Sequence, residues 1–175
     1  AKDKYGNRLI LGADCYMIEI AAPHMQTVKH TLTDNNDGTY TVRYTPVYQG
    51  HHDIRIWGRE RDAKRKGVLG PRVLIQHGDP VFVHCTAADT LARCCTASGD
   101  GIVGITTAGK LQTFLLTARD RFGNARPTGG DVFDVTIRAA WDVECSVHDN
   151  RDGTYLVEYL CGNEDEYAGP TNYVV

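Results

Sequence analysis

One short motif occurs twice in this chain, and it restricts the possible fold more than any other feature. Asp34–Tyr40 has the sequence DNNDGTY, and Asp149–Tyr155, 115 residues further on, has DNRDGTY. Asp and Asn side chains bond to the nearby backbone and glycine accepts a positive φ, so each copy predicts a tight turn. An alternating strand follows each turn, with inward residues Tyr40, Val42 and Tyr44 in the first copy and Tyr155, Val157 and Tyr159 in the second. A turn and a strand repeated at this spacing predict tandem β domains.

Two further blocks repeat in the same order and with nearly the same spacing. Lys2–Asn7 matches Arg119–Asn124, and Gly12–Ile20 matches Gly130–Ile137. The second match aligns two sets of alternating apolar residues, which we expect to face the core: Tyr16, Ile18 and Ile20 in the first copy, and Phe133, Val135 and Ile137 in the second. We therefore interpret the chain as two copies of one module.

The remaining segments are short and bounded by glycine, proline, Asp or Asn, and none has the periodicity of an amphipathic helix. This pattern is typical of an antiparallel β-sandwich. We expect a first domain over residues 1–78 that lacks its first strand and a second domain over residues 79–175 that lacks its last strand, both within a longer array. Val81–Cys85 is expected to open the second domain, and Gly169–Val175 resembles Gly50–Ile56.

Charge and cysteine content narrow the function classes. The net charge of −3 gives no electrostatic basis for binding nucleic acid, and no apolar run is long enough for direct membrane insertion. The six cysteines include no CxxC pair, and the adjacent Cys94 and Cys95 are poorly placed for a disulfide. These features favour free thiols inside a cell over disulfides outside it.

Four short patterns look like ligand-binding motifs but lack the context that such motifs need. Gly99–Gly104 matches GxGxxG, yet no helical periodicity follows it. Gly104–Lys110 resembles a P-loop, but Leu111 stands where a hydroxyl residue would bind magnesium. Counted from Asp34, the glycine is one position too early for a calcium-binding EF-hand loop, and His51–His52 has no ligand partner nearby in the sequence. We expect no catalytic, cofactor-binding or metal-binding residues, and no enzyme activity.

Several of these blocks together resemble filamin-type immunoglobulin repeats. They are Ala118–Asn124, Gly129–Ile137 and Asp149–Tyr155. In the first copy, Tyr44–Pro46 also matches the Y-x-P pattern of these repeats. The resemblance covers nearly the whole chain and implies an all-β fold of tandem antiparallel immunoglobulin-like sandwiches. It also implies that partner proteins add a strand beside the third strand of a repeat, where main-chain hydrogen bonds supply affinity and alternating pockets supply specificity.

Carried over to this sequence, the resemblance implies a candidate strand-addition groove in each copy. In the second copy the added strand would lie beside Val132, Asp134 and Thr136, with Val143, Cys145 and Val147 across the groove. In the first copy the corresponding residues are Cys15, Met17 and Glu19, with Thr27, Lys29 and Thr31 across from them. The alternative is that these strands are solvated or covered by a neighbouring repeat.

A cluster of charge follows the fourth strand expected in the first copy. The segment is expected to be a loop between the last two strands of that copy, and its basic residues are Arg59, Arg61, Lys64, Arg65 and Lys66. Such a loop is either simply solvated or a contact site for an acidic polymer or a phospholipid.

The resemblance implies a structural, protein-binding segment of a larger cytoskeletal or ciliary scaffold, acting as a spacer and a docking surface. Its partners would be cytoskeletal or scaffold proteins and neighbouring repeats of the same chain, in the cytoplasm with the cytoskeleton or a cilium. Two alternatives remain open. Disulfides would favour an ectodomain of a cell-surface adhesion protein, and a RING pattern in the neighbouring sequence would favour the substrate-recognition segment of a ubiquitin ligase.

Overall fold

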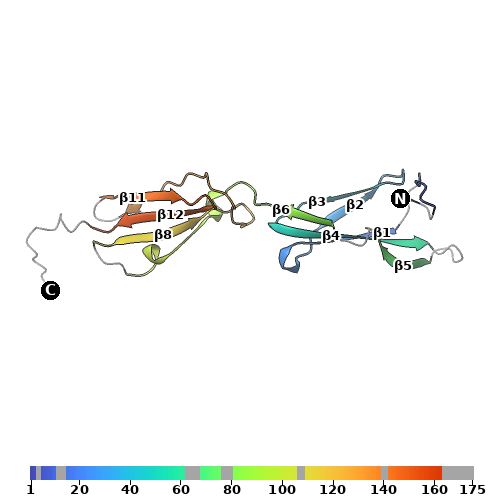
Figure 1. The fold of residues 1–175 in the computed structure, drawn as a ribbon, viewed down its shortest axis with the longest axis horizontal. Helices are drawn as coiled ribbons and strands as arrows, with labels where there is room; N and C mark the ends of the chain where they lie inside the picture. The colour runs from blue at the N-terminus through green and yellow to red at the C-terminus, as the bar shows by residue number, and fades with distance from the viewer. Residues whose placement is uncertain are drawn as a thin grey trace, which may run out of the picture. The chain divides into compact units, whose positions relative to one another are not determined.

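The computed structural model describes residues 1–2, 5–10, 15–61, 68–75, 81–105, 109–138 and 142–162. These residues form antiparallel strands and three single-turn 3-10 helices, with no α-helix among them. The chain divides into two compact units, Ala1–Thr86 and Ala87–Val175 (Figure 1). The all-β fold class and the tandem arrangement that the repeated motifs predict are therefore confirmed.

The first unit is built around the long strand β4 (Gly50–Arg61), which has neighbours on both edges. β1 (Cys15–Ala21) pairs along one edge, and β5 (Leu69–Leu74) pairs along the other. A second sheet consists of β2 (His30–Asp34) and β3 (Tyr40–Tyr44). The short helix η1 (Pro23–Met25) lies between β1 and β2 in the chain.

The strand β6 (Val81–Cys85) also pairs with β4, from Gly50↔Cys85 to Ile54↔Val81. Ile54 of β4 pairs with Ile20 of β1 on one side and with Val81 of β6 on the other. β6 therefore lies on the edge of β4 opposite β1, which is the edge that β5 also occupies. We expected Val81–Cys85 to open the second domain and the division to follow residue 78, but the compact units divide after Thr86. The physical reason is that β5 pairs only with the second half of β4, which leaves the first half of that edge for β6.

The core of the first unit lies between its two sheets. The buried residues Ile18, Ile20, Ala22 and Val28 form one cluster, and the inward residues of β3 and β4 pack against it: Val42, Tyr44, Ile54 and Ile56. Tyr16 and Tyr40 make an edge-to-face contact with ring centroids 4.6 Å apart. The period-2 alternation that the sequence predicts for these strands is thus what brings the sheets together.

The second unit contains a four-stranded sheet in the order β11 (Cys145–Asp149), β12 (Thr154–Leu160), β8 (Leu111–Thr117) and β7 (Thr96–Ser98). A short hairpin of β9 (Ile137–Arg138) and β10 (Asp142–Val143) accompanies it. The 3-10 helices η2 (Ala92–Cys94) and η3 (Asp100–Ile102) flank β7 in the chain. Phe114, Val157 and Tyr159 form the buried core cluster, because every second residue of β8 and β12 faces inward.

The two copies of the turn motif fold with the same hydrogen bonds. In each copy, two Asp side chains accept the backbone N–H of the residue two positions later: Asn36 to Asp34 (2.8 Å), Thr39 to Asp37 (2.9 Å), Arg151 to Asp149 (2.7 Å) and Thr154 to Asp152 (2.9 Å). Hydrogen bonds from Thr39 and Thr154 hold the pKa values of Asp37 and Asp152 below the ordinary value. The turns therefore owe their shape to local side-chain bonds.

Two expected strands differ from the structure or lie outside it. Asp131–Ile137 alternates in burial as predicted, but among the described residues only Ile137–Arg138 is a strand, because the residues before it have no ladder partner there. Gly169–Val175 lies outside the described residues.

Candidate protein-binding edges

The first candidate edge is the free side of β1. Among the described strands, β1 is a terminal strand of its sheet. At its end, an isolated bridge joins Ala21 and Thr27, and the backbone N–H of Val28 donates to the carbonyl oxygen of Ile20 at 2.9 Å. Cys15 and Glu19 are exposed and Met17 is half-buried, while the intervening Ile18 is buried. The structure thus places the three expected residues on one outward face of a strand that is terminal among the described strands, and strand addition uses such a terminal strand.

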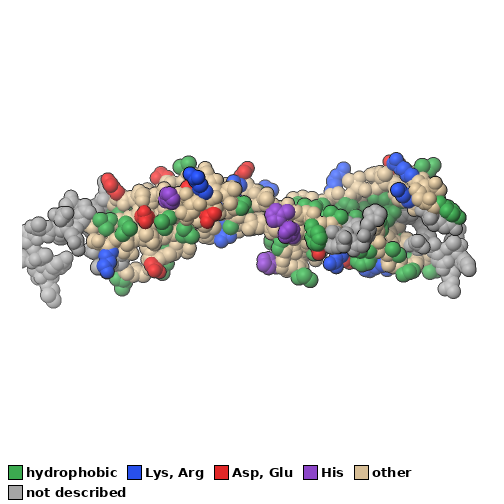
Figure 2. All heavy atoms as spheres, in the orientation of Figure 1, with side chains coloured by type: hydrophobic (Ala, Val, Ile, Leu, Met, Phe, Trp, Pro, Cys, Tyr) green, Lys and Arg blue, Asp and Glu red, His purple; other side chains and the backbone are tan. Residues whose placement is uncertain are grey.

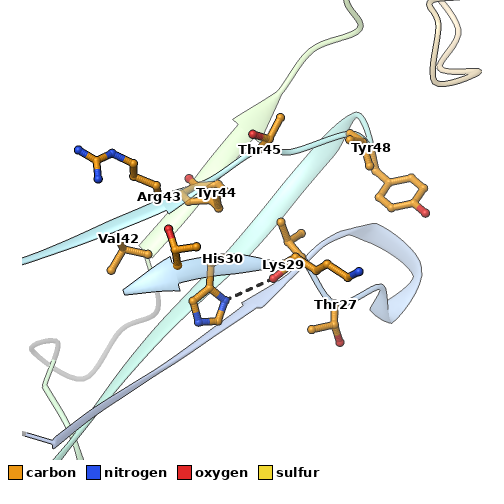
Figure 3. Close-up of a pocket in the computed structure, with 11 residues that line it drawn as sticks. Thr27, Lys29, His30, Val42, Arg43, Tyr44, Thr45 and Tyr48 are labelled. Carbon is orange, nitrogen blue, oxygen red and sulfur yellow. Dashed lines mark hydrogen bonds between the residues drawn. The ribbon is translucent and has the colours of Figure 1, made fainter. Parts of the chain in front are cut away.

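The residues expected across from β1 line a different space. Thr27, Lys29 and Thr31 are exposed and line a groove of about 950 Å³, shown in Figure 3. Its other walls come from β3 and the segment after it, through Arg43, Tyr44, Thr45, Val47 and Tyr48. The described residues that line this groove include no residue of β1, so the two expected rows lie in separate hollows.

The groove has a positive character. Its lining residues include Lys29 and Arg43 but neither Asp nor Glu. His30 also contributes, and its Nδ1 lies 3.4 Å from the carbonyl oxygen of Val28, the hydrogen bond dashed in Figure 3. Three threonines and two tyrosines surround these groups. The groove therefore offers several polar side chains and two cations to an extended ligand.

The β1 residues Cys15 and Met17 line a smaller pocket of about 190 Å³. It also includes Trp57, Arg59 and Arg72, and the last two lie opposite each other on β4 and β5. Both arginines are exposed. The indole Nε1 of Trp57 is buried and has no hydrogen-bond partner among the described residues. A buried donor without a partner costs free energy, whereas the exposed arginines leave positive charge at this pocket.

The candidate edge of the second unit is only partly as expected. Val132, Asp134 and Thr136 are exposed, and Val132 is 96% exposed. Between them, Phe133 packs edge-to-face against Tyr155 with ring centroids 4.7 Å apart. The outward face of this segment is therefore open to a partner.

The residues expected across that groove face the other way. Val143 and Cys145 pack against the core cluster, and Val147 lies opposite the buried Val157. The thiol of Cys145 donates to the carbonyl oxygen of Val135 at 3.2 Å. Val143 and Cys145 therefore belong to the inner face of β10 and β11, whereas Val147 is 37% exposed. The period of two along β11 sets this orientation, because Cys145 and Val147 share the face of their partners on β12.

The expected basic loop is shorter than its sequence indicates. Arg59 and Arg61 belong to β4, which continues to Arg61 and pairs with β5. Lys64, Arg65 and Lys66 lie outside the described residues. A contact between this loop and an acidic polymer or phospholipid therefore stays a prediction.

One buried carboxylate in the second unit was missed by the sequence reasoning. Asp120 is 1% exposed and accepts four hydrogen bonds, from the backbone N–H groups of Ala88, Phe122 and Asn124 and from the Asn124 side chain. Burial alone would raise its pKa, but the hydrogen bonds outweigh it and hold the pKa below the ordinary value. Asp120 therefore joins the beginning of this unit to its repeated loop.

A second buried group lies beside the candidate edge. The Tyr155 hydroxyl accepts the N–H of Asp131 at 2.9 Å and lies 3.3 Å from the Asp131 carboxylate, which also accepts the Thr90 hydroxyl at 2.8 Å. Burial raises the pKa of Tyr155, and the charges of Asp131 and Asp149 act in the same direction. This network fixes the start of the exposed segment that carries Val132.

All six cysteines lie among the described residues and none is in a disulfide. In the part of the chain that the structure describes, no group of three or more His, Cys, Asp or Glu side chains is placed to hold a metal ion. No helix within the described ranges is long and apolar enough to cross a bilayer.

The sequence was compared with protein families and with individual proteins. The model of the Filamin/ABP280 repeat matches residues 1–66 and 89–168. Mouse (Mus musculus) filamin-C is 28% identical over 150 residues, which is 86% of this chain but 5% of the relative. The dynein alpha chain of the flagellar outer arm from Chlamydomonas reinhardtii is 35% identical over 83 residues, which is 46% of this chain and 2% of the relative. The chain thus spans only a small part of these relatives.

Among solved structures, the Escherichia coli adhesin FdeC matches with a TM-score of 0.42. The sequence identity is 21%, and the match covers 92% of this chain and 47% of the adhesin chain.

Proposed function

Because this chain belongs to the Filamin/ABP280 repeat family, we propose that it is a structural, protein-binding segment of a larger cytoskeletal or ciliary scaffold. It acts as a spacer between neighbouring domains and as a docking surface for partner proteins. The observation that carries the docking role is the outer edge of β1, which presents outward side chains and pairs with no other strand among the described residues apart from β4. An extended partner segment adds a strand there.

The pocket at the start of β1 suggests the chemistry of that partner. Arg59 and Arg72 place two positive charges side by side, and Trp57 holds a buried N–H without a partner among the described residues. A segment that carries a carboxylate matches the two arginines, because a carboxylate forms charge-assisted hydrogen bonds with guanidinium groups. The proposed partner is therefore an extended segment with an acidic residue near one end.

The choice of a cytoskeletal or ciliary host rests on the relatives. One relative is a dynein of the flagellar outer arm, which supports a ciliary host, and another is a filamin, which supports a cytoskeletal host. The free thiols support an intracellular location, because disulfides persist mainly in oxidising compartments. We propose no catalytic role, in keeping with the family.

Strand addition can be tested on the two edges of one sheet. Peptide ligands for the chain are selected from a display library of extended peptides. Binding is measured by the fluorescence of Trp57, which pairs with Met17 of β1, in a Trp141→Phe variant that has no other tryptophan. Met17→Asp introduces a charge at the β1 edge, and we expect at least about a tenfold loss of affinity. Phe82→Asp is the matched control, since Phe82 is 61% exposed at the opposite edge. Equal losses in both variants would refute docking at β1.

A further inference from the structure

His51 and His84 lie opposite each other on β4 and β6 in the first unit. Their ring centroids are 4.9 Å apart at an interplanar angle of 66°, and both side chains are exposed. Figure 2 shows histidine side chains gathered on this surface. The neighbouring His52 points to the other face, where it is fully buried with its Nδ1 3.1 Å from the Gly50 carbonyl oxygen. The strand pleat thus places only the first histidine of the pair His51–His52 beside His84.

The spacing of the two rings fits a shared metal ion. Imidazole nitrogens bind zinc at about 2.0–2.1 Å, and two imidazoles on one tetrahedral ion have centroids roughly 5 Å apart. The observed separation of 4.9 Å is close to this value, so the strand pairing already brings the two rings to the distance that one shared ion requires. Opposite positions on paired strands also hold the two side chains at a fixed spacing. The arrangement is therefore pre-organised for chelation.

The surroundings leave the pair accessible and offer it no third metal ligand within the part of the chain that the structure describes. Phe82 approaches the His51 ring at 6.5 Å and forms an apolar side wall. Asp53, two residues further along β4, places its Oδ2 3.5 Å from Arg55, and its Oδ1 is buried without a hydrogen-bond partner among the described residues. The described residues contain no group of three metal-binding side chains. A metal held here would therefore keep open positions for water or for a group of another molecule.

We propose that His51 and His84 form a two-histidine binding site for a divalent transition metal such as Zn²⁺. The ion bridges β4 and β6. β6 is the last strand of the first unit and has no described partner other than β4, so the bridge holds this strand in the sheet just before the second unit begins at Ala87. The proposal does not depend on the proposed partner binding, because it concerns the opposite edge of the sheet.

The test is a Zn²⁺ titration of the whole chain followed by NMR of the imidazole signals. We expect the His51 and His84 signals to shift together and at lower Zn²⁺ concentration than those of the other histidines, and EDTA to reverse the shift. His51→Asn and His84→Asn should each weaken zinc binding at least about tenfold, because chelation by two linked ligands is lost. His148→Asn is the matched control, since His148 is exposed on a strand and faces Leu156.

The outcomes separate a chelating pair from scattered weak binding. If all histidines shift over one concentration range, or if His51→Asn and His84→Asn leave zinc affinity unchanged, the proposed site does not exist. Urea unfolding in EDTA shows whether each variant retains the fold. Because the two single variants lie on different strands, one still tests the site if the other unfolds. Added Zn²⁺ should raise the urea midpoint of the first unit in the wild type and not in the double variant. A rise of equal size in both would also overturn the proposal.

Discussion

The carboxylate of Asp120 accepts the backbone N–H of Ala88 at 2.9 Å, although the two residues are 32 positions apart. The same carboxylate accepts three further bonds from Phe122 and Asn124 within its own loop. One buried side chain thus ties the beginning of the second unit to the loop that both copies of the repeat share in sequence. This relationship leads to the first two predictions.

Asp120→Asn should destabilise the second unit by about 2–3 kcal/mol, because an amide has one acceptor oxygen and turns its NH₂ group toward the N–H donors that Asp120 now accepts. Native-state hydrogen exchange at the buried Val157 amide measures the change. Asp134→Asn, at an exposed position of the same unit, is the control and should change the exchange little. Equal effects of the two substitutions would contradict the structural role of Asp120.

The stabilisation by Asp120 should depend on pH in a defined direction. Its pKa in the folded protein lies below the ordinary value of 3.8, so the charged form is favoured by folding. The contribution is therefore complete above the ordinary pKa and is lost as the pH falls through the lowered pKa of the folded state. We expect the stability difference between wild type and Asp120→Asn to be large at pH 7 and to shrink below about pH 4. A difference that stays constant over this range would argue against an ionised Asp120.

Gly153 tests the repeated turn. It has φ +84°, and a Cβ added there would overlap the backbone carbonyl of Arg126. Gly123 has almost the same φ of +86°, but nothing lies near its Cβ position. Gly123→Ala should therefore lower the free energy of unfolding by only about 1 kcal/mol, because of the left-handed conformation alone. Gly153→Ala should lower it by about 3 kcal/mol, because the overlap with the carbonyl is added. Urea unfolding of the two variants gives both values, and equal costs would show that the close approach does not matter.

The repeated turn was predictable because its bonds are local. Asp37 and Thr39 are two residues apart, so the sequence alone contains both partners of their hydrogen bond. The alternation of the strands was predictable for the same reason, since burial follows the period of two along β12.

Long-range pairing was not predictable in this way. Val81–Cys85 alternates like any half-buried strand, and nothing in it indicates that its partner is Gly50–Ile54. Asp120 has a visible local partner in Asn124, but its bond to Ala88 depends on tertiary structure. The pair His51–His84 could not be seen either, since the two residues meet only through the pairing of β4 and β6.

Arg59 and Arg72 give the last prediction, in which stability and binding change in opposite directions. They are exposed and directly opposite on β4 and β5, and like charges in such a pair destabilise a sheet. Arg72→Glu replaces repulsion by attraction and should raise the unfolding free energy of the first unit by up to about 1 kcal/mol. The same change removes a positive charge from the pocket beside β1, so it should weaken the binding of an acidic extended peptide and reduce the salt dependence of that binding. Urea unfolding and peptide titrations at two salt concentrations measure both effects, with Arg93→Glu, at an exposed position of the second unit, as the control for the change in net charge. If Arg72→Glu lowers the unfolding free energy, Arg59 and Arg72 do not repel each other in the folded sheet. If it binds the acidic peptide as tightly as the wild type, Arg72 is not part of the proposed docking site.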